Sequence, residues 1–198
     1  MSKVELRQII KRTIQELDES QKLEKSRNIS KQLASFLLDQ NYIHRKIGGF
    51  YPLDDEVNWL LESPISENAN LAFPLMYGDS QMSFRLCAVK DLELKRAYGR
   101  EFREPAESCD EVSPEVIIVP AMAFDRSGNR LGRGKGFYDK FLSNRDDAKM
   151  SKDIGTIKIG ICFHEQLVEK VPVDDHDIPV DFIITDKEFV KVSNRREE

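Results

Sequence analysis

Residues 115–141 read EVIIVPAMAFDRSGNRLGRGKGFYDKF, and they join an apolar run to an amphipathic segment through a glycine-rich loop. The apolar run at 116–120, VIIVP, is nearly continuous, as expected for a strand in a sheet covered on both faces. The segment 136–144, GFYDKFLSN, has the pattern of a helix. A buried strand, a loop and a helix in this order are typical of an α/β fold.

Similar apolar runs and helical patterns recur along the chain. Further strands are predicted at 47–51, 70–75, 82–89, 157–163 and 181–186, and a further helix at 55–63 (DEVNWLLES). Strands mixed with helices predict an α/β sandwich with a largely parallel central sheet. Two polar stretches, 103–114 and 143–154, are interpreted as surface loops, the second alternatively as the end of a helix.

The first 40 residues predict two helices, together spanning 3–40, that pack on the α/β core. Their apolar residues form two stripes at helical spacing: Leu6, Ile9, Ile10, Ile14 and Leu17, then Leu23, Ile29, Leu33, Phe36 and Leu37. Asp18, followed three residues later by Gln21, provides a start signal for the second helix. Because we find no internal repeat and no linker, residues 1–198 are interpreted as a single domain.

Composition excludes several classes of protein. Charged residues make up 33% of the 198 residues and hydrophobic residues 40%, which is ordinary for a folded soluble chain. No apolar run approaches the roughly 18 residues of a membrane span. Charges interrupt the N-terminal segment where a signal peptide would be apolar. We therefore expect a cytoplasmic protein with no membrane partner.

The cysteines, the histidines and the net charge disfavour several kinds of binding site. Cys87, Cys109 and Cys162 are scattered, and such a sparse, odd set is expected to be reduced thiols rather than a disulfide frame or a zinc site. The three histidines are equally dispersed, which disfavours a histidine-built metal centre. A formal net charge of −5 argues against a nucleic-acid partner, although it leaves room for a local cationic pocket.

The glycine loop itself, 128–139, carries Arg133 and Lys135 between alternating glycines. Glycines allow positive φ and close approach of the backbone, so that N–H groups and cations converge on an anion at the start of a helix. The spacing fits neither the P-loop nor the dinucleotide fingerprint. The alternative is a solvated turn, but the preceding strand and following helix favour an anion site.

Asp139 falls on the first turn of the helix after this loop, where a carboxylate complements the helix dipole. The functional alternative is a ligand for Mg²⁺ beside bound phosphates. The neighbouring aromatic residues are interpreted as helix packing, and among them Tyr138 has a polar group that could contact a ligand.

Residues 120–139 resemble the signature of the 5-formyltetrahydrofolate cyclo-ligase family, also called 5,10-methenyltetrahydrofolate synthetases. That signature runs P-x-x-x-F-D-x-x-G-x-R-L-G-R-G-x-G-Y-Y-D, and this chain matches it from Pro120 to Asp139. Weaker landmarks occur in the expected order: K-x-x-x-R at Lys3 and Arg7, an acidic turn after a strand at 50–56, and V-P-x-x-x-x-D at 171–177.

The resemblance implies a three-layer α/β/α sandwich. It also implies a reaction that uses ATP and Mg²⁺ to convert 5-formyltetrahydrofolate, with or without a polyglutamate tail, to 5,10-methenyltetrahydrofolate, ADP and phosphate. The formyl oxygen would be phosphorylated first, and N10 of the folate would then attack the formyl carbon and close the ring. A monomer or weak dimer is expected.

Site residues carry over from the family by motif. ATP would contact Lys3, Arg7, Arg130, Gly132, Arg133, Gly134, Lys135, Gly136, Phe137 and Tyr138. Among these, Arg133 and Lys135 would be catalytic, with Arg133 as a bidentate phosphate ligand and Lys135 as a point charge. The metal would be bound by Asp139 and Asp177, and the folate by Tyr51, Glu56 and Tyr98.

Several of these assignments have alternatives. Asp174, Asp175 and Asp181 could replace Asp177; Asp54 or Asp55 could replace Glu56; and Tyr98 could belong to the core, as Trp59 and Phe73 are expected to. Phe137 stands where relatives commonly have tyrosine, and Lys135 where many bacterial relatives have glycine. Leu75 replaces a basic residue of many relatives, which bears on contact with the folate tail.

Two other classes of function remain as alternatives. One is an ATP-independent enzyme on a similar sandwich, such as a sugar-phosphate isomerase or a CoA-transferase. The other is a non-catalytic protein that binds phosphate or RNA through the cationic loop. ATP turnover that depends on a reduced formyl-folate distinguishes these classes.

Overall fold

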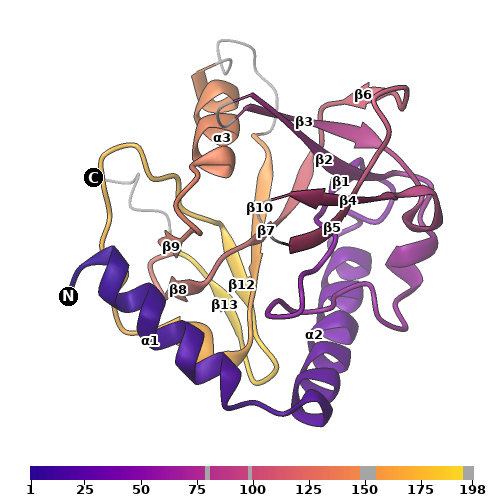
Figure 1. The fold of residues 1–198 in the computed structure, drawn as a ribbon. Coiled ribbons are helices and arrows are strands. Elements are labelled where there is room, and N and C mark those ends of the chain that lie inside the picture. Colours follow the sequence, from indigo (N-terminus) through magenta and orange to yellow (C-terminus); the bar gives the residue numbers. More distant parts are fainter. Residues whose placement is uncertain (79–80, 98–99, 148–154, 194–198) are drawn as a thin grey trace.

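The computed structural model describes residues 1–78, 81–97, 100–147 and 155–193. Within these ranges, eight strands form one sheet in the order β13-β12-β10-β7-β1-β2-β3-β6 (Figure 1). The strands of this sheet are β1 (Ile47–Gly48), β2 (Leu71–Tyr77), β3 (Gln81–Leu86), β6 (Glu111–Val112), β7 (Val116–Pro120), β10 (Ile157–Ile161), β12 (Phe182–Ile184) and β13 (Phe189–Lys191).

The centre of this sheet is parallel. Strands β12, β10, β7, β1 and β2 pair in parallel, whereas β13, β3 and β6 add antiparallel strands at the edges. In the longest parallel pair, β7 and β10, Ile118 lies opposite Ile159. The predicted, largely parallel sheet is confirmed.

Helices cover both faces of the sheet. On β7, Val116 and Ile118 point into one apolar cluster, and Ile117 and Val119 into another, and all four side chains are 0% exposed. The first cluster contains the buried apolar residues of α1 (Lys3–Gln15) and α2 (Glu19–Asp39), and the second contains Leu142 of α3 (Phe137–Asp147). Helix, sheet and helix therefore form the three layers (Figure 1).

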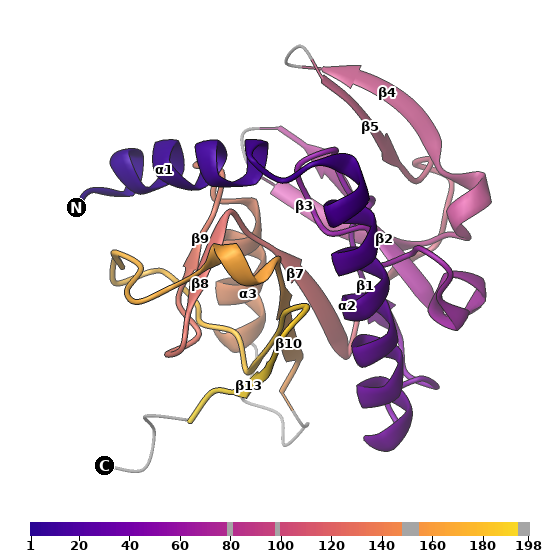
Figure 2. The same cartoon turned by 90° about the horizontal axis from the view of Figure 1, so that it is seen from below.

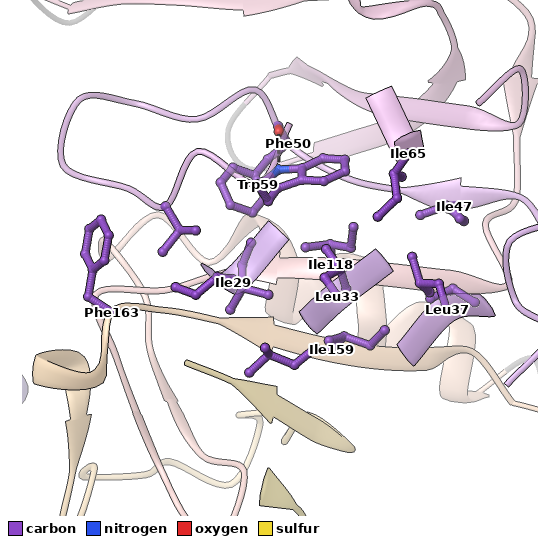
Figure 3. Close-up of a cluster of buried hydrophobic side chains, with 14 of the residues drawn as sticks. Ile29, Leu33, Leu37, Ile47, Phe50, Trp59, Ile65, Ile118, Ile159 and Phe163 are labelled. Carbon is purple, nitrogen blue, oxygen red and sulfur yellow. Dashed lines mark hydrogen bonds between the residues drawn. The ribbon is translucent and has the colours of Figure 1, made fainter. Parts of the chain in front are cut away.

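The cluster beneath α2 is the larger one. Figure 3 shows Ile29, Leu33, Leu37, Ile47, Phe50, Trp59, Ile65, Ile118, Ile159 and Phe163 within it. The Trp59 indole donates to the Phe50 carbonyl at 2.9 Å, which satisfies the polar atom of a fully buried ring. A Cβ at Gly49 would come within 2.3 Å of this ring, so only glycine fits there. Trp59 and Phe73 are core residues, as predicted.

Both N-terminal helices begin with a capping box. Ser2 and Glu5 exchange side-chain and backbone hydrogen bonds at the start of α1, and Asp18 and Gln21 do so at the start of α2. The start signal predicted at Asp18 is confirmed. These helices occupy residues 3–15 and 19–39, within the predicted 3–40.

The helix predicted at 55–63 is wrong. Turns occupy this stretch, and a 3-10 helix (Pro64–Glu67) follows it. Val57 and Trp59 are 2% and 0% exposed and flank the exposed Asn58, so burial alternates along the chain here. Packing of these two side chains into the core overrides the helix-like pattern.

The loop predicted at 103–114 contains the end of β5 (Arg100–Glu104) and all of β6. Strand β5 pairs with β4 (Glu93–Ala97) in an antiparallel hairpin that projects from the body of the molecule (Figure 2). Of the stretch 143–154, residues 143–147 continue α3, and the remainder lies outside the described residues.

A small second sheet is formed by two strands that lie between β7 and α3 in the chain and one that follows β10. It consists of β11 (Leu167–Val168), β8 (Ala123–Asp125) and β9 (Arg130–Leu131). Among the described residues, no helix is both long and apolar enough to span a bilayer.

Candidate functional site

The glycine loop lies at a change in the direction of strand order. Strand β1 continues to its neighbour β2 on one side, whereas β7, the neighbour of β1 on its other side, continues through α3 to β10. Connections leaving the carboxyl ends of two such strands diverge, and α/β proteins bind ligands in the crevice between them. Residues 49–56 leave β1 here, and residues 121–136 leave β7.

The loop has the backbone conformation that its glycines predict. Gly134 and Gly136 have φ of 96° and 70°, in the left-handed region that favours glycine. Within the loop, β9 (Arg130–Leu131) is followed by residues 132–136, which lead to the start of α3 at Phe137. Arg7, on α1, donates from Nε to the carbonyl of Gly132 at 2.9 Å, so the N-terminal helix holds the loop from one side.

A buried carboxylate shapes the turn before the loop. Asp125 is 2% exposed and accepts hydrogen bonds from the amides of Ser127 and Asn129, and from Asn129 Nδ2, at 2.9–3.1 Å. Its second oxygen also accepts from the Val171 amide at 3.0 Å. Asp125 therefore ties the loop to the segment that leads to Asp177.

Arg133 spans the crevice between the two connections. Its guanidinium donates to both carboxylate oxygens of Asp55 at 2.7 and 3.0 Å, and to Oε1 of Glu56 at 2.9 and 3.1 Å. The other Glu56 oxygen accepts from the Leu53 amide at 3.0 Å, which fixes the acidic turn. We call Arg133, Asp55 and Glu56 the Arg133 junction. The Arg133 side chain keeps 31% of its surface exposed.

Arg130, three residues earlier, has a different environment. Its side chain is 3% exposed, pairs with Asp139 at 2.5 Å and donates to the carbonyl of Ile178. Burial lowers the pKa of Arg130 from its ordinary value, while the charges of Asp139 and Asp177 oppose that change. Asp139, predicted as a metal ligand, is therefore bound to Arg130 here.

Lys3 holds the other predicted metal ligand. Its Nζ lies 2.5 Å from Asp177 and 2.7 Å from Asp174, and Asp177 also accepts from the Asp174 amide at 2.8 Å. We call Lys3, Arg130, Asp139, Asp174 and Asp177, with the Ile178 carbonyl, the Arg130 cluster. One ligand atom each from Asp174, His176 and Asp177 lies within 4.8 Å of the others.

Two of the alternatives to Asp177 have different partners in the structure. Asp174 shares the Lys3 ammonium with Asp177. Asp181 instead accepts from the Lys158 amide at 2.7 Å and pairs with its Nζ at 3.2 Å, at the amino ends of β10 and β12. Of these two alternatives, Asp174 is the one that the fold brings to Asp177.

Tyr138 is influenced by charges of both the Arg133 junction and the Arg130 cluster. Its hydroxyl is buried and has no hydrogen-bond partner among the described residues. Burial, followed by the charge of Glu56, raises the pKa of this hydroxyl, while Arg130 lowers it. A buried polar atom without a partner at this position marks a place for a ligand or ordered water. Phe137, the neighbouring residue of the motif, packs against the second apolar cluster.

The structure describes two of the three residues predicted to bind folate. Glu56 belongs to the Arg133 junction, and Tyr51 packs against the first apolar cluster with Arg103 of β5 over its ring at 5.6 Å. Tyr98 lies outside the described residues. Leu75 is 8% exposed and belongs to β2.

Sequence reasoning missed three contributors to the site: Asp125, Arg103 and the carbonyl of Ile178. Asp125 precedes the turn residues Ser-Gly-Asn, which signal a side-chain-capped turn. Arg103 and the Ile178 carbonyl carry no such signal, because only the folded chain brings them near Tyr51 and Arg130.

Comparisons with known proteins agree over nearly the whole chain. The profile of the 5-formyltetrahydrofolate cyclo-ligase family matches residues 1–186. A mouse protein named 5-formyltetrahydrofolate cyclo-ligase is 25% identical over 189 residues, which cover 90% of this chain and 91% of the mouse chain. The Escherichia coli K12 protein of the same name is 39% identical over 89 residues, 43% of this chain and 46% of the other.

Solved structures show the same fold. The solution structure of Aquifex aeolicus 5,10-methenyltetrahydrofolate synthetase superposes with a TM-score of 0.75 at 29% identity, covering 100% of this chain and 96% of that one. A synthetase from Mycoplasma pneumoniae shares the fold with a TM-score of 0.70 at 22% identity, covering 94% and 99%. The three-layer sandwich predicted from the resemblance is thus confirmed.

Proposed function

This chain belongs to the 5-formyltetrahydrofolate cyclo-ligase family, and from that premise we propose that it uses ATP and Mg²⁺ to convert 5-formyltetrahydrofolate to 5,10-methenyltetrahydrofolate. The observation that carries the proposal is the position of the cationic glycine loop. It lies at the switch point of the sheet, opposite an acidic turn, in a chain that matches the family from residue 1 to residue 186.

The donor set of the loop fits a polyphosphate. Arg133 offers a planar fork of donors and Lys135 a point charge, both next to glycines whose conformation leaves the backbone accessible. When bound, ATP would supply the phosphoryl group that makes the formyl oxygen a leaving group, and Mg²⁺ would neutralise phosphate charge. Arg133 would exchange Asp55 and Glu56 for phosphate oxygens, and Arg7 would keep Gly132 in place.

Two carboxylates of the Arg130 cluster, together with the nearby His176, fit a small hard cation. Two carboxylates and an imidazole, from Asp174, Asp177 and His176, offer ligand atoms close together, and carboxylate oxygens are suitable for Mg²⁺. The Lys3 ammonium now neutralises both carboxylates, so a metal at Asp177 would share or displace it. Arg130 would orient Asp139 from beneath the loop, because its enclosed guanidinium already contacts that carboxylate and Ile178.

The folate would lie on the side of the crevice formed by 49–56. Glu56 accepts from the Leu53 amide, a bond that remains when Arg133 turns to phosphate, so it would present a carboxylate with a defined orientation to the N–H groups of a pterin. Tyr51 supplies an aromatic face beside it. Holding N10 against the formyl carbon would replace a bimolecular encounter, an effect that reaches about 7–11 kcal/mol in favourable systems.

The test is the formation of methenyl-folate, followed by its near-ultraviolet absorbance. Absorbance should rise only when ATP, Mg²⁺ and 5-formyltetrahydrofolate are all present, and a chelator should stop it. Product formed without ATP would indicate an ATP-independent enzyme. No product under any condition, with tight binding of phosphate or RNA, would indicate a non-catalytic binding protein.

A further inference from the structure

Two of the three cysteines, far apart in the sequence, meet at the base of the β4–β5 hairpin. Strands β3 and β6 pair with Phe84 opposite Val112 and Arg85 opposite Glu111, and the Leu86 amide donates to the Asp110 carbonyl at 2.9 Å. Extending this register by one residue places Cys87 opposite Cys109.

Side-chain contacts support this pairing. The Cys87 thiol donates to the Ala88 carbonyl at 3.4 Å and lies close enough to Cys109 for that residue, after burial, to raise its pKa, and both cysteines pack in the first apolar cluster. On the same face, Arg85 donates to the Cys109 carbonyl at 3.2 Å and pairs with Glu111 at 3.0 Å, which holds the two strands together beside the thiols.

The backbone geometry suits a disulfide. The paired residues end at Arg85 and Glu111, the Leu86–Asp110 hydrogen bond continues the contact, and Cys87 and Cys109 follow directly on the two segments. Residues opposite one another in antiparallel strands have Cα atoms typically about 4.5–5.5 Å apart. Disulfides are found with Cα separations of about 4.4–6.8 Å. The two chain segments therefore need little movement to be bridged.

We propose that Cys87 and Cys109 are a redox-active dithiol that a low-molecular-weight disulfide oxidises to an intramolecular disulfide, closing the base of the β4–β5 hairpin. This proposal does not depend on the proposed function. The third cysteine, Cys162, is 1% exposed and belongs to the second apolar cluster, on the other face of the sheet.

The chemistry balances in two thiol–disulfide exchanges. Cys109, which is half-buried, reacts first: its thiolate attacks one sulfur of the oxidant, forms a mixed disulfide and releases one thiolate. The Cys87 thiolate then attacks Cys109 Sγ and releases the second. Two protons and two electrons leave the cysteines, and the oxidant becomes two thiols. Burial, followed by contact with Cys109 and the charges of Asp91 and Glu93, raises the pKa of Cys87 to about 11, which suits the second, intramolecular attack rather than the first.

The bridge would enclose residues 88–108, which contain both strands of the hairpin. Linking its two ends restricts the unfolded chain and so stabilises the folded one. Oxidised protein should therefore unfold at a higher urea concentration than reduced protein.

The experiment treats the full-length protein with glutathione disulfide, unfolds it, alkylates the remaining thiols and counts them by intact mass. Reduced protein should show three reactive thiols, and oxidised protein should show one, with Cys87 and Cys109 joined in a single cross-linked peptide. Cys162→Ser should lose two thiols in the same way. Cys109→Ser should keep both remaining thiols and show no rise in the urea midpoint.

Two results would overturn the proposal. One is a stable glutathione adduct on Cys109 with Cys87 still alkylated, which would show that the thiols cannot approach. The other is loss of thiols through dimers linked between chains. Circular dichroism of each variant establishes that it is folded, and Cys162→Ser provides the same test with the dithiol intact.

Discussion

Two arginines three residues apart in one loop have opposite environments. Arg130 is 3% exposed and is enclosed by Asp139 and the Ile178 carbonyl, whereas Arg133 is 31% exposed and reaches across the crevice to Asp55 and Glu56. An enclosed guanidinium with its partners in place cannot exchange them without leaving a buried charge unpaired. A half-open one can exchange its partners for ligand oxygens at little cost.

This difference indicates different roles for the two arginines of the motif. The Arg130 cluster fixes the start of α3 against the segment carrying Asp177, and the Arg133 junction presents donors to the crevice. In our account, the first arginine is a positioning residue and the second is catalytic. Substitutions in the two regions should therefore have different consequences for folding and for turnover.

The largest expected effect is on stability, in Arg130→Ala. Removing this guanidinium leaves the Asp139 carboxylate and the Ile178 carbonyl without their partner, and breaking a buried pair typically costs about 3–5 kcal/mol. Urea denaturation should show this loss in the free energy of unfolding. The comparison breaks down if Arg130→Ala proves no less stable than Arg133→Ala.

Arg133→Ala should affect turnover instead. We expect kcat to fall on the order of 10²-fold or more, with a change in unfolding free energy of less than about 1 kcal/mol, because the ion pairs lost are partly exposed. Lys135→Ala should act in the same direction. Arg133→Lys, which keeps charge but loses the bidentate fork, should recover only part of the rate. Near-normal turnover in both alanine variants would make the loop a surface turn.

Asp177→Asn tests the open end of the Arg130 cluster. The Mg²⁺ concentration for half-maximal activity should rise roughly tenfold, and excess Mg²⁺ should partly restore turnover, since one carboxylate ligand is weakened. The matched control is Asp181→Asn, because that carboxylate lies with Lys158 at the other end of its segment. If titrations of Asp177→Asn and wild type coincide, Asp177 is not a metal ligand.

The smallest effect concerns pH. Burial raises the pKa of Asp177, but hydrogen bonds from Lys3 and from the Asp174 amide outweigh it and hold the pKa below its ordinary value. Such a carboxylate stabilises the fold above its unfolded-state pKa of about 3.9 and loses this contribution as pH falls through the folded-state value. Wild type should exceed Asp177→Asn by about 1 kcal/mol at pH 6, and the gap should close towards pH 3. A gap that stays constant with pH would rule out the ion pair as its source.

Local patterns in the sequence predicted much of the fold. The continuous apolar run VIIVP places alternate residues on the two faces of the sheet, and the Asp18–Gln21 signal marks the true start of α2. The failure at 55–63 has the opposite cause. Val57 and Trp59 are buried by contacts from outside their own segment, and no local periodicity encodes such contacts.

The same limit applies to the candidate site: local patterns could be predicted, and contacts between distant segments could not. Glycine spacing predicted a loop with positive φ, confirmed at Gly134 and Gly136. The sequence assigned both Arg130 and Arg133 to ATP and could not show that Arg130 is enclosed, because only the three-dimensional packing encloses one of them. It also could not show that Asp174 reaches the Lys3 ammonium while Asp181 lies with Lys158.

The proposed ATP-dependent ring closure is tested most directly by comparing phosphate release with methenyl-folate formation in the same reaction. We expect one phosphate released for each methenyl-folate formed, only background release when 5-formyltetrahydrofolate is omitted, and loss of both signals together in Arg133→Ala. Equal phosphate release with and without the folate would contradict this expectation and would leave a simple ATPase.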